Sequence, residues 1–162
     1  MKLRDTEPPT VEQAYQYALR LLGARDYTSL KLRQKLFARS IIESDVEVVI
    51  KRLNTEGWLN DNRFAERFTE SVLLSGRFFG QRLQMELRRR GVSKELAAET
   101  AGRMQQEYDE IKEMRSVLER HYPGFSFDTA TNREKRRVIA YLQRRGFSSS
   151  AIGEALHKRT QE

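Results

Sequence analysis

The chain has 162 residues, of which 38% are hydrophobic and 33% are charged, and its net charge is +7. This balance leaves little apolar material for a thick enzyme core and favours thin, stacked helical units. The positive charge favours a polyanionic partner, such as nucleic acid, a nucleoprotein filament or an anionic membrane surface.

Two absences narrow the setting in which the chain works. It contains no cysteine, so disulfides and thiolate metal sites are excluded, which is consistent with a reducing compartment. No stretch approaches 18 consecutive apolar residues, and residues 1–10 lack the apolar segment of a secretory signal. We therefore expect a cytoplasmic protein that does not cross or bind a membrane.

The first part of the chain predicts three helices after a polar lead, residues 1–12, which we expect to be loose. The first helix is indicated by apolar residues at helical spacing, Ala14, Tyr17, Ala18, Leu21 and Leu22. Residues 26–29 interrupt this pattern and supply capping side chains for a second helix. Ser44 and Glu47 have the spacing of a capping box, which predicts the start of a third helix, and Gly57 is suited to end that helix.

The same three-helix unit begins again near residue 60. Asn60 and Asp61 provide an N-cap for its first helix. A second helix is predicted over residues 81–90 and ends at Gly91, and Ser93 caps the third.

A third unit follows from about Tyr108, with a longer connection over residues 121–131. Its second helix is predicted over residues 133–145 and ends at Gly146, and residues 148–150 lead into a short final helix. No segment alternates with the period of a strand, so the fold class is all-α.

Three stretches of the chain repeat one pattern, an apolar residue followed four later by Leu, then by a small residue and an apolar one. They are residues 32–41, 83–92 and 138–147. Leu36 and Leu87 lie 51 residues apart, and Leu87 and Leu142 lie 55 apart. A repeat of this length is one supersecondary unit used three times. The sequence therefore predicts an elongated, curved array of three tandem three-helix repeats, residues 13–59, 60–107 and 108–162.

Superposing the three second helices separates an inner face from an outer face. The inner face carries Leu32 and Leu36, Leu83 and Leu87, and Val138 and Leu142. The outer face carries a basic stripe, which consists of Lys31, Arg82, Arg89, Arg133, Arg137 and Arg144. The stripe becomes more basic from the first repeat to the third. It is either a solvated helix face or, as we hypothesise, a contact surface for phosphate or acidic groups, to which arginine forks are suited.

Two further groups of residues recur at the ends of the units. Arg39, Arg90 and Arg145 lie at the C-terminal ends of the second helices, where a cation stabilises the helix dipole, so we expect a structural role. Aromatic residues gather at the unit junctions, namely Trp58, Phe78, Phe79, Tyr122 and Phe125. They either seal the joints between repeats, which we favour, or stack on the bases of a single strand. Phe64 and Phe68 lie on one regular helical face and are expected in the core.

No pattern in the chain indicates catalysis. His121 and His157 are far apart and have no partner at helical spacing, so no metal site is expected. The glycines of residues 76–82 are not followed by the Lys and Ser/Thr that bind nucleotide phosphates. Residues 148–150 lack the setting of a nucleophilic serine. We therefore expect a protein that is not an enzyme and that needs no cofactor.

Three ordered motifs resemble those of the RecX family of recombination regulators. Residues 57–68, Gly-Trp-Leu-Asn-Asp-Asn-Arg-Phe-Ala-Glu-Arg-Phe, are similar to the family's hallmark segment. Residues 80–87 followed by Arg-Gly-Val at 90–92 resemble its next segment, and residues 18–36 resemble its first. The likeness covers about residues 15–158. Its structural motif positions here are Gly57, Trp58, Leu59, Asp61, Phe64, Phe68, Gly80, Leu87 and Gly91.

The resemblance implies three tandem three-helix repeats that bind the RecA recombinase filament on DNA. It further implies inhibition of the ATPase and strand-exchange activities of RecA, and hence a role in recombinational DNA repair and the SOS response. Weaker, salt-dependent binding to single- and double-stranded DNA is expected, and we expect a monomer. Two departures are Leu83 in place of Ile and residues 71–74, Ser-Val-Leu-Leu, which are more apolar than the Arg- or Lys-bearing stretch that the resemblance leads us to expect.

Two other classes of function remain open from the sequence. A general DNA- or RNA-binding repeat protein would bind naked nucleic acid through its basic face with a steep salt dependence. A pure protein–protein adaptor would ignore naked nucleic acid and would lose little partner binding when the stripe is removed.

Overall fold

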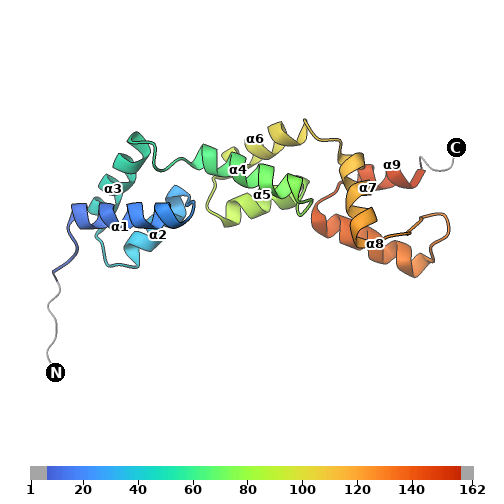
Figure 1. The fold of residues 1–162 in the computed structure, drawn as a ribbon, viewed down its shortest axis with the longest axis horizontal. Helices are drawn as coiled ribbons and strands as arrows, with labels where there is room; N and C mark the ends of the chain where they lie inside the picture. Colours follow the sequence, from blue (N-terminus) through green and yellow to red (C-terminus); the bar gives the residue numbers. More distant parts are fainter. Residues whose placement is uncertain (1–6, 158–162) are drawn as a thin grey trace, which may run out of the picture. The chain divides into compact units, whose positions relative to one another are not determined.

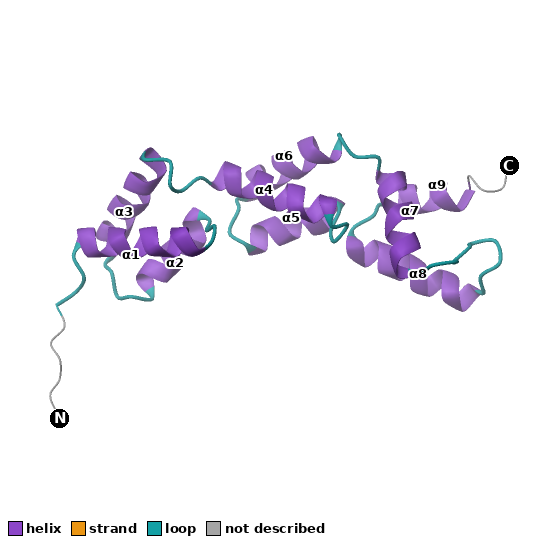
Figure 2. Cartoon of the chain, in the orientation of Figure 1, coloured by secondary structure: helices purple, strands orange, loops and turns teal. Residues whose placement is uncertain are grey.

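The structure is a computed structural model and describes residues 7–157, which form helices connected by loops and turns (Figure 2). The helices in chain order are α1 (Val11–Ala24), α2 (Ser29–Phe37), α3 (Glu43–Thr55), α4 (Asp61–Leu74), α5 (Gly80–Arg89), α6 (Lys94–Gln105), α7 (Glu110–His121), α8 (Asn132–Arg145) and α9 (Ser149–His157) (Figure 1). The all-α prediction is confirmed. Within these residues, no helix is both long and apolar enough to traverse a bilayer.

The chain folds as two compact units. Among the described residues, the first contains residues 7–65 and 89–92, and the second contains residues 66–88 and 93–157. In the first unit, α3 packs against both α1 and α2. In the second unit, α9 packs against both α7 and α8. The inner-face prediction is confirmed in all three repeats, because Leu32, Leu36, Leu83, Leu87, Val138 and Leu142 are each at most 2% exposed.

The first unit begins earlier than the sequence predicts. Thr10 and Gln13 form a reciprocal capping box, in which the Gln13 backbone N–H donates to Thr10 Oγ1 over 3.2 Å and the Thr10 N–H donates to Gln13 Oε1 over 2.9 Å. Since this box opens α1 at Val11, the last two residues of the predicted loose lead are helical. Residues 1–6 of that lead lie outside the described residues.

The predicted capping box at Ser44 is wrong. Helix α3 already begins at Glu43, so Ser44 lies inside its first turn, and the N-cap is Ile42, which makes no side-chain cap. Glu47 is therefore not needed by the helix end. Its carboxylate instead accepts two hydrogen bonds from the Arg33 guanidinium, at 2.6 and 3.0 Å.

The predicted cap of α4 is divided between two residues. Asn60 alone caps the helix, since its Oδ1 accepts from the Arg63 N–H over 2.9 Å. The Asp61 carboxylate accepts instead from the Ser29 N–H over 2.7 Å, so it closes the start of α2 from a distant part of the chain. This is a structural role for Asp61, although a different one from the N-cap that we expected.

The residue before a second helix contacts the residue at or after the end of the following second helix, and we call this contact a helix-end joint. At the first joint, the Thr28 hydroxyl, just before α2, donates to the Arg90 carbonyl, just after α5, over 2.6 Å. At the second joint, the Phe79 N–H, just before α5, donates to the Arg145 carbonyl at the end of α8 over 2.7 Å. Thr28 and Phe79 are separated by 51 residues, and Arg90 and Arg145 by 55, which are the two repeat offsets. The residues that form the joints therefore recur with the same spacing as the repeats themselves.

A glycine is required at each joint for two reasons. Gly91 and Gly146 have φ of +94° and +97°, which L residues rarely adopt. A Cβ at Gly91 would also lie 2.5 Å from Thr28 Oγ1, and a Cβ at Gly146 would overlap the Phe79 carbonyl oxygen. At the third equivalent position, after α2, stands Ser40 with φ of +58°, the one non-glycine residue with positive φ in the described part of the chain.

We expect Gly146→Ala to destabilise the second unit more than a positive φ alone explains. Adopting the left-handed region costs an L residue about 1–2 kcal/mol. Gly57→Ala is the matched control, because Gly57 has φ of +78° but no atom within 4 Å of an added Cβ. Urea unfolding followed by circular dichroism should give a clearly larger loss of unfolding free energy for Gly146→Ala. Equal losses would show that the joint tolerates a Cβ.

A polar cluster in the first unit makes its stability depend on acid pH. Arg52 donates to Glu56 and to Glu12, each over 2.9 Å, and lies 3.6 Å from the ring centre of Tyr15, whose hydroxyl donates to Glu56. The bond from Tyr15 and the one from Arg52 lower the pKa of Glu56 below its ordinary value of 4.5. Bonds from Gln16 and Arg52 lower the pKa of Glu12 in the same way. Because these folded pKa values are depressed, the stabilisation is present above the unfolded pKa and is lost as the pH falls through the folded pKa.

We therefore expect the thermal unfolding midpoint of the protein to fall as the pH drops below about 4.5, and Glu56→Gln to make that fall shallower. Glu70→Gln serves as the control, because Glu70 is exposed and lies on α4, outside this cluster. Circular dichroism melts over a pH series measure the effect. A pH dependence identical in wild type and Glu56→Gln would rule out Glu56 as a contributor.

Candidate functional site

The structure distributes the six residues of the basic stripe over three places. Lys31 and Arg89 line a cleft at the first helix-end joint. Arg82 and Arg144 line a cleft at the second joint. Arg133 and Arg137 lie on α8 and line neither cleft. Four stripe residues are exposed, whereas Lys31 and Arg82 are half-buried.

The first cleft has a volume of about 570 Å³ and is strongly basic. The cations that line it are Arg25, Lys31, Lys35, Arg89 and Arg90. Asp26 is the one carboxylate among its lining residues. These side chains come from the loop before α2, from α2 itself and from the end of α5, so the cleft exists only because the joint brings these segments together.

Thr28 holds the first cleft in shape. Its side chain is fully buried, and its hydroxyl both accepts from the Lys31 N–H over 3.3 Å and donates to the Arg90 carbonyl. One hydroxyl thus caps α2 and ties it to the end of α5. Tyr27 is 9% exposed, and the Arg25 guanidinium lies 4.7 Å from the centre of its ring, which positions one of the cations.

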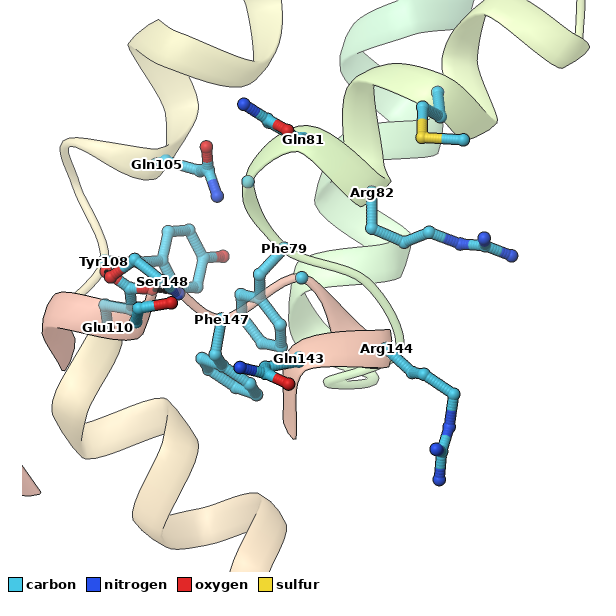
Figure 3. A pocket seen from close by; sticks show the side chains of 14 residues that line it. Phe79, Gln81, Arg82, Gln105, Tyr108, Glu110, Gln143, Arg144, Phe147 and Ser148 are labelled. Carbon is cyan, nitrogen blue, oxygen red and sulfur yellow. Dashed lines mark hydrogen bonds between the residues drawn. The ribbon is translucent and has the colours of Figure 1, made fainter. Parts of the chain in front are cut away.

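The second cleft is larger, about 840 Å³, and its lining is mixed in character. At its centre Phe79 and Phe147 stack with ring centres 4.2 Å apart (Figure 3). Arg82 and Arg144 extend away from this aromatic pair, while Tyr108, Glu110 and Ser148 gather on its other side (Figure 3). The second cleft is also lined by Met85, which is 52% exposed, and by three glutamines, Gln81, Gln105 and Gln143.

The two clefts are equivalent in register. Lys31 and Arg82 are 51 residues apart and occupy the same position near the start of α2 and α5. Arg89 and Arg144 are 55 residues apart and occupy the same position at the end of α5 and α8. Each cleft therefore receives one cation from the start of a second helix and one from the end of the next. The helical wheel placed these residues on one face but did not indicate that they pair across joints.

Arg82 has a structural partner that the stripe hypothesis did not include. Its Nη2 lies 2.9 Å from Oε1 of Glu86, which is only 4% exposed, and its guanidinium lies 5.4 Å from the Phe78 ring centre. Removing Arg82 would leave a buried carboxylate without this cation, which is strongly destabilising. Arg82 is therefore unsuitable as a test of surface contact.

The three recurring arginines have specific local contacts. Arg145 Nη1 donates to the carbonyls of Gly76 and Arg77, over 2.9 and 3.3 Å, so it anchors the turn between α4 and α5. The Arg39 guanidinium lies 4.4 Å from the Tyr17 ring centre. The structural role expected for Arg145 is confirmed, although through carbonyls of another turn. Arg90, by contrast, lines the first cleft.

The junction aromatics divide between buried and exposed positions. Phe79 is 2% exposed and seals the second joint, as predicted. Tyr122 packs edge-on against Tyr141 at 5.3 Å and lies 6.4 Å from Phe125, so both junction residues belong to an aromatic cluster of the third repeat. Trp58 is 58% exposed, so the prediction that it seals a joint is wrong.

The remaining motif positions are mostly structural. Gly57 and Gly80 have positive φ, of +78° and +51°, and a Cβ at Gly80 would lie 2.7 Å from the Gly146 carbonyl oxygen. Leu59 and Leu87 are at most 2% exposed. Phe64 and Phe68 are half-buried rather than in the core.

Over residues 7–157, no group of three or more His, Cys, Asp or Glu side chains is placed to bind a metal ion. The His157 side chain lies outside the part that can be described. Sequence reasoning did not identify Arg25 and Lys35 as cleft residues, and it assigned Arg90 a structural role. Lys35 could have been found, since it lies four residues after Lys31 on the same face of α2.

Comparison with protein families gives the same three-part division. The family model described as the first three-helix domain of RecX matches residues 14–53, the second matches residues 60–100, and the third matches residues 107–156. The matched segments contain α2, α5 and α8, which are the second helices of the three repeats.

Relatives and solved structures agree with the family models. The chain is 42% identical over 144 residues to the regulatory protein RecX of Trichlorobacter lovleyi, covering 89% of this chain and 94% of that protein. It is 32% identical over 139 residues to the regulatory protein RecX of Syntrophotalea carbinolica, covering 86% and 91%. The crystal structure of RecX from Lactobacillus salivarius has a TM-score of 0.78 at 17% identity, covering 94% of this chain and 97% of that one. The chain therefore belongs to the RecX family of regulatory proteins.

Proposed function

We propose that this protein binds the RecA recombinase filament on DNA and inhibits its ATPase and strand-exchange activities, thereby modulating recombinational DNA repair. It acts in the cytoplasm as a monomer and without catalysis of its own. Membership of a family of regulatory proteins supports this proposal. The observation that carries it is the pair of register-equivalent clefts, each lined by cations from two successive second helices.

The chemistry of these clefts suits a nucleoprotein filament. A filament on DNA presents both phosphates and protein carboxylates, and arginine forks contact either group. Equivalent clefts in successive repeats suit a partner whose own groups recur along an axis. A regulator that prefers one arrangement of filament subunits stabilises that arrangement by its differential affinity, and this opposes any step that must leave it.

Two observations bear on the alternatives. A non-specific nucleic-acid-binding protein relies mainly on phosphate contacts, whereas the second cleft also offers Met85, three glutamines and Glu110. A pure protein adaptor would not require the five cations of the first cleft. A partner that contains both protein and DNA accounts for both clefts.

We expect the triple variant Arg133→Ala, Arg137→Ala and Arg144→Ala to lose inhibition of RecA ATPase on single-stranded DNA. All three side chains are exposed on α8, and losing about 1.4 kcal/mol of binding free energy raises the inhibitory concentration about tenfold. The measurement is ATP turnover by RecA on single-stranded DNA, titrated with wild type and with the variant. Arg82 is left in place because Glu86 needs it.

The matched control removes three exposed cations outside the stripe, Lys51, Lys112 and Arg115, each replaced by Ala. It has the same net charge as the stripe variant, so it measures the effect of charge alone. Wild-type protein that leaves the ATPase unchanged would refute the proposed function. Full inhibition by the stripe variant, with unchanged helical circular dichroism, would refute the role of the α8 cations.

A further inference from the structure

We propose that the first cleft binds the phosphodiester backbone of single-stranded DNA. This inference rests on the proposed function and deepens it, because it names the component of the filament that one of the two clefts contacts. It also reverses the expectation that the contact surface is most basic toward the third repeat.

The charge of the first cleft favours a polyanion. Five cations and one carboxylate line about 570 Å³, whereas the larger second cleft is lined by two cations and one carboxylate. Three of the five, Arg25, Lys35 and Arg89, are exposed residues. A strand of DNA neutralises several such charges at once and releases its counterions, which is the main source of affinity in contacts of this kind.

The first cleft is also positioned before any ligand arrives. Thr28 joins the start of α2 to the end of α5 through a 2.6 Å hydrogen bond, and Gly91 allows the two backbones to approach. Lys31 and Lys35 are one helical turn apart on α2 and line the same cleft as Arg89 and Arg90. A cleft whose cations stand on two tied helix ends loses little conformational freedom on binding, which favours affinity.

The lining of the first cleft argues against a protein partner at this position. Protein interfaces are centred on accessible aromatic or aliphatic side chains that are buried on binding. In the first cleft Tyr27 is 9% exposed and already covered, and Phe64 is half-buried. The second cleft has such an anchor in Met85, together with amide groups that can pair with a peptide. The first cleft therefore suits a backbone of phosphates better than a folded surface.

The test is a salt titration of DNA binding without recombinase. Fluorescence anisotropy of a labelled oligo-dT strand is measured with wild type and with the triple variant Lys31→Ala, Lys35→Ala and Arg89→Ala. Each lost phosphate contact lowers the slope of log K against log salt by about 0.7 for a single strand, so the slope should fall by about 2. At about 0.1 M salt this corresponds to a loss of affinity of about a hundredfold.

The variant Lys51→Ala, Lys112→Ala and Arg115→Ala is the matched control, since it loses the same charge from exposed positions outside both clefts. We expect it to keep most of the wild-type slope. The double variant Lys31→Arg and Lys35→Arg keeps the charges and should retain binding, which separates loss of contact from loss of fold. Helical circular dichroism and the unfolding midpoint are recorded for every variant.

Three outcomes would overturn the assignment. Equal loss of slope in the two triple variants would show that only net charge matters. An unchanged slope in the first-cleft variant would place the phosphates elsewhere. Displacement of the DNA from the wild-type protein by poly-glutamate at equal charge concentration would indicate an acidic protein partner. None of these results decides whether RecA ATPase is inhibited, so failure here is distinguishable from failure of the proposed function.

Discussion

The close approach of two backbones at the helix-end joint is the constraint on which the rest of the structure depends. At the first joint the Thr28 hydroxyl, before α2, donates to the Arg90 carbonyl, after α5. At the second joint the Phe79 N–H, before α5, donates to the Arg145 carbonyl, at the end of α8. Both contacts require a residue without Cβ opposite them, Gly91 and Gly146. The basic clefts follow from this geometry, because only the joint brings cations of successive helices to the rim of one hollow.

The position of Ser40 shows which of the two glycine requirements comes from the joint. Ser40 is equivalent to Gly91 and Gly146 in the repeat and shares their positive φ. A short polar side chain tolerates the left-handed region at a modest cost. Among the described residues, no backbone hydrogen bond joins the start of another second helix to the end of α2. The conformational requirement therefore remains at Ser40, whereas the steric requirement is lost, and a side chain is accepted.

The sequence was sufficient for the parts of the fold that depend on local periodicity. Leu36, Leu87 and Leu142 indicated the inner face, and Gly57 indicated the end of α3. It misled where a side chain had a choice between a local and a distant partner. Glu47 pairs with Arg33 instead of capping α3, and Asp61 closes α2 instead of α4. Such choices depend on which chain ends meet in space, and spacing along one helix does not contain that information.

The same reasoning bears on where positive charge is concentrated in the fold. A helical wheel counts cations on one helix, so α8 with Arg133, Arg137 and Arg144 ranked above α2. A cleft at a joint sums cations from two helix ends and from the loop between them, and Arg25 and Arg90 belong to no stripe. Charge density around a ligand depends on that sum, because screening confines each cation's influence to about 10 Å at 0.1 M salt. In this protein, the density of positive charge at the first cleft is therefore set by the joint between repeats rather than by any single helix.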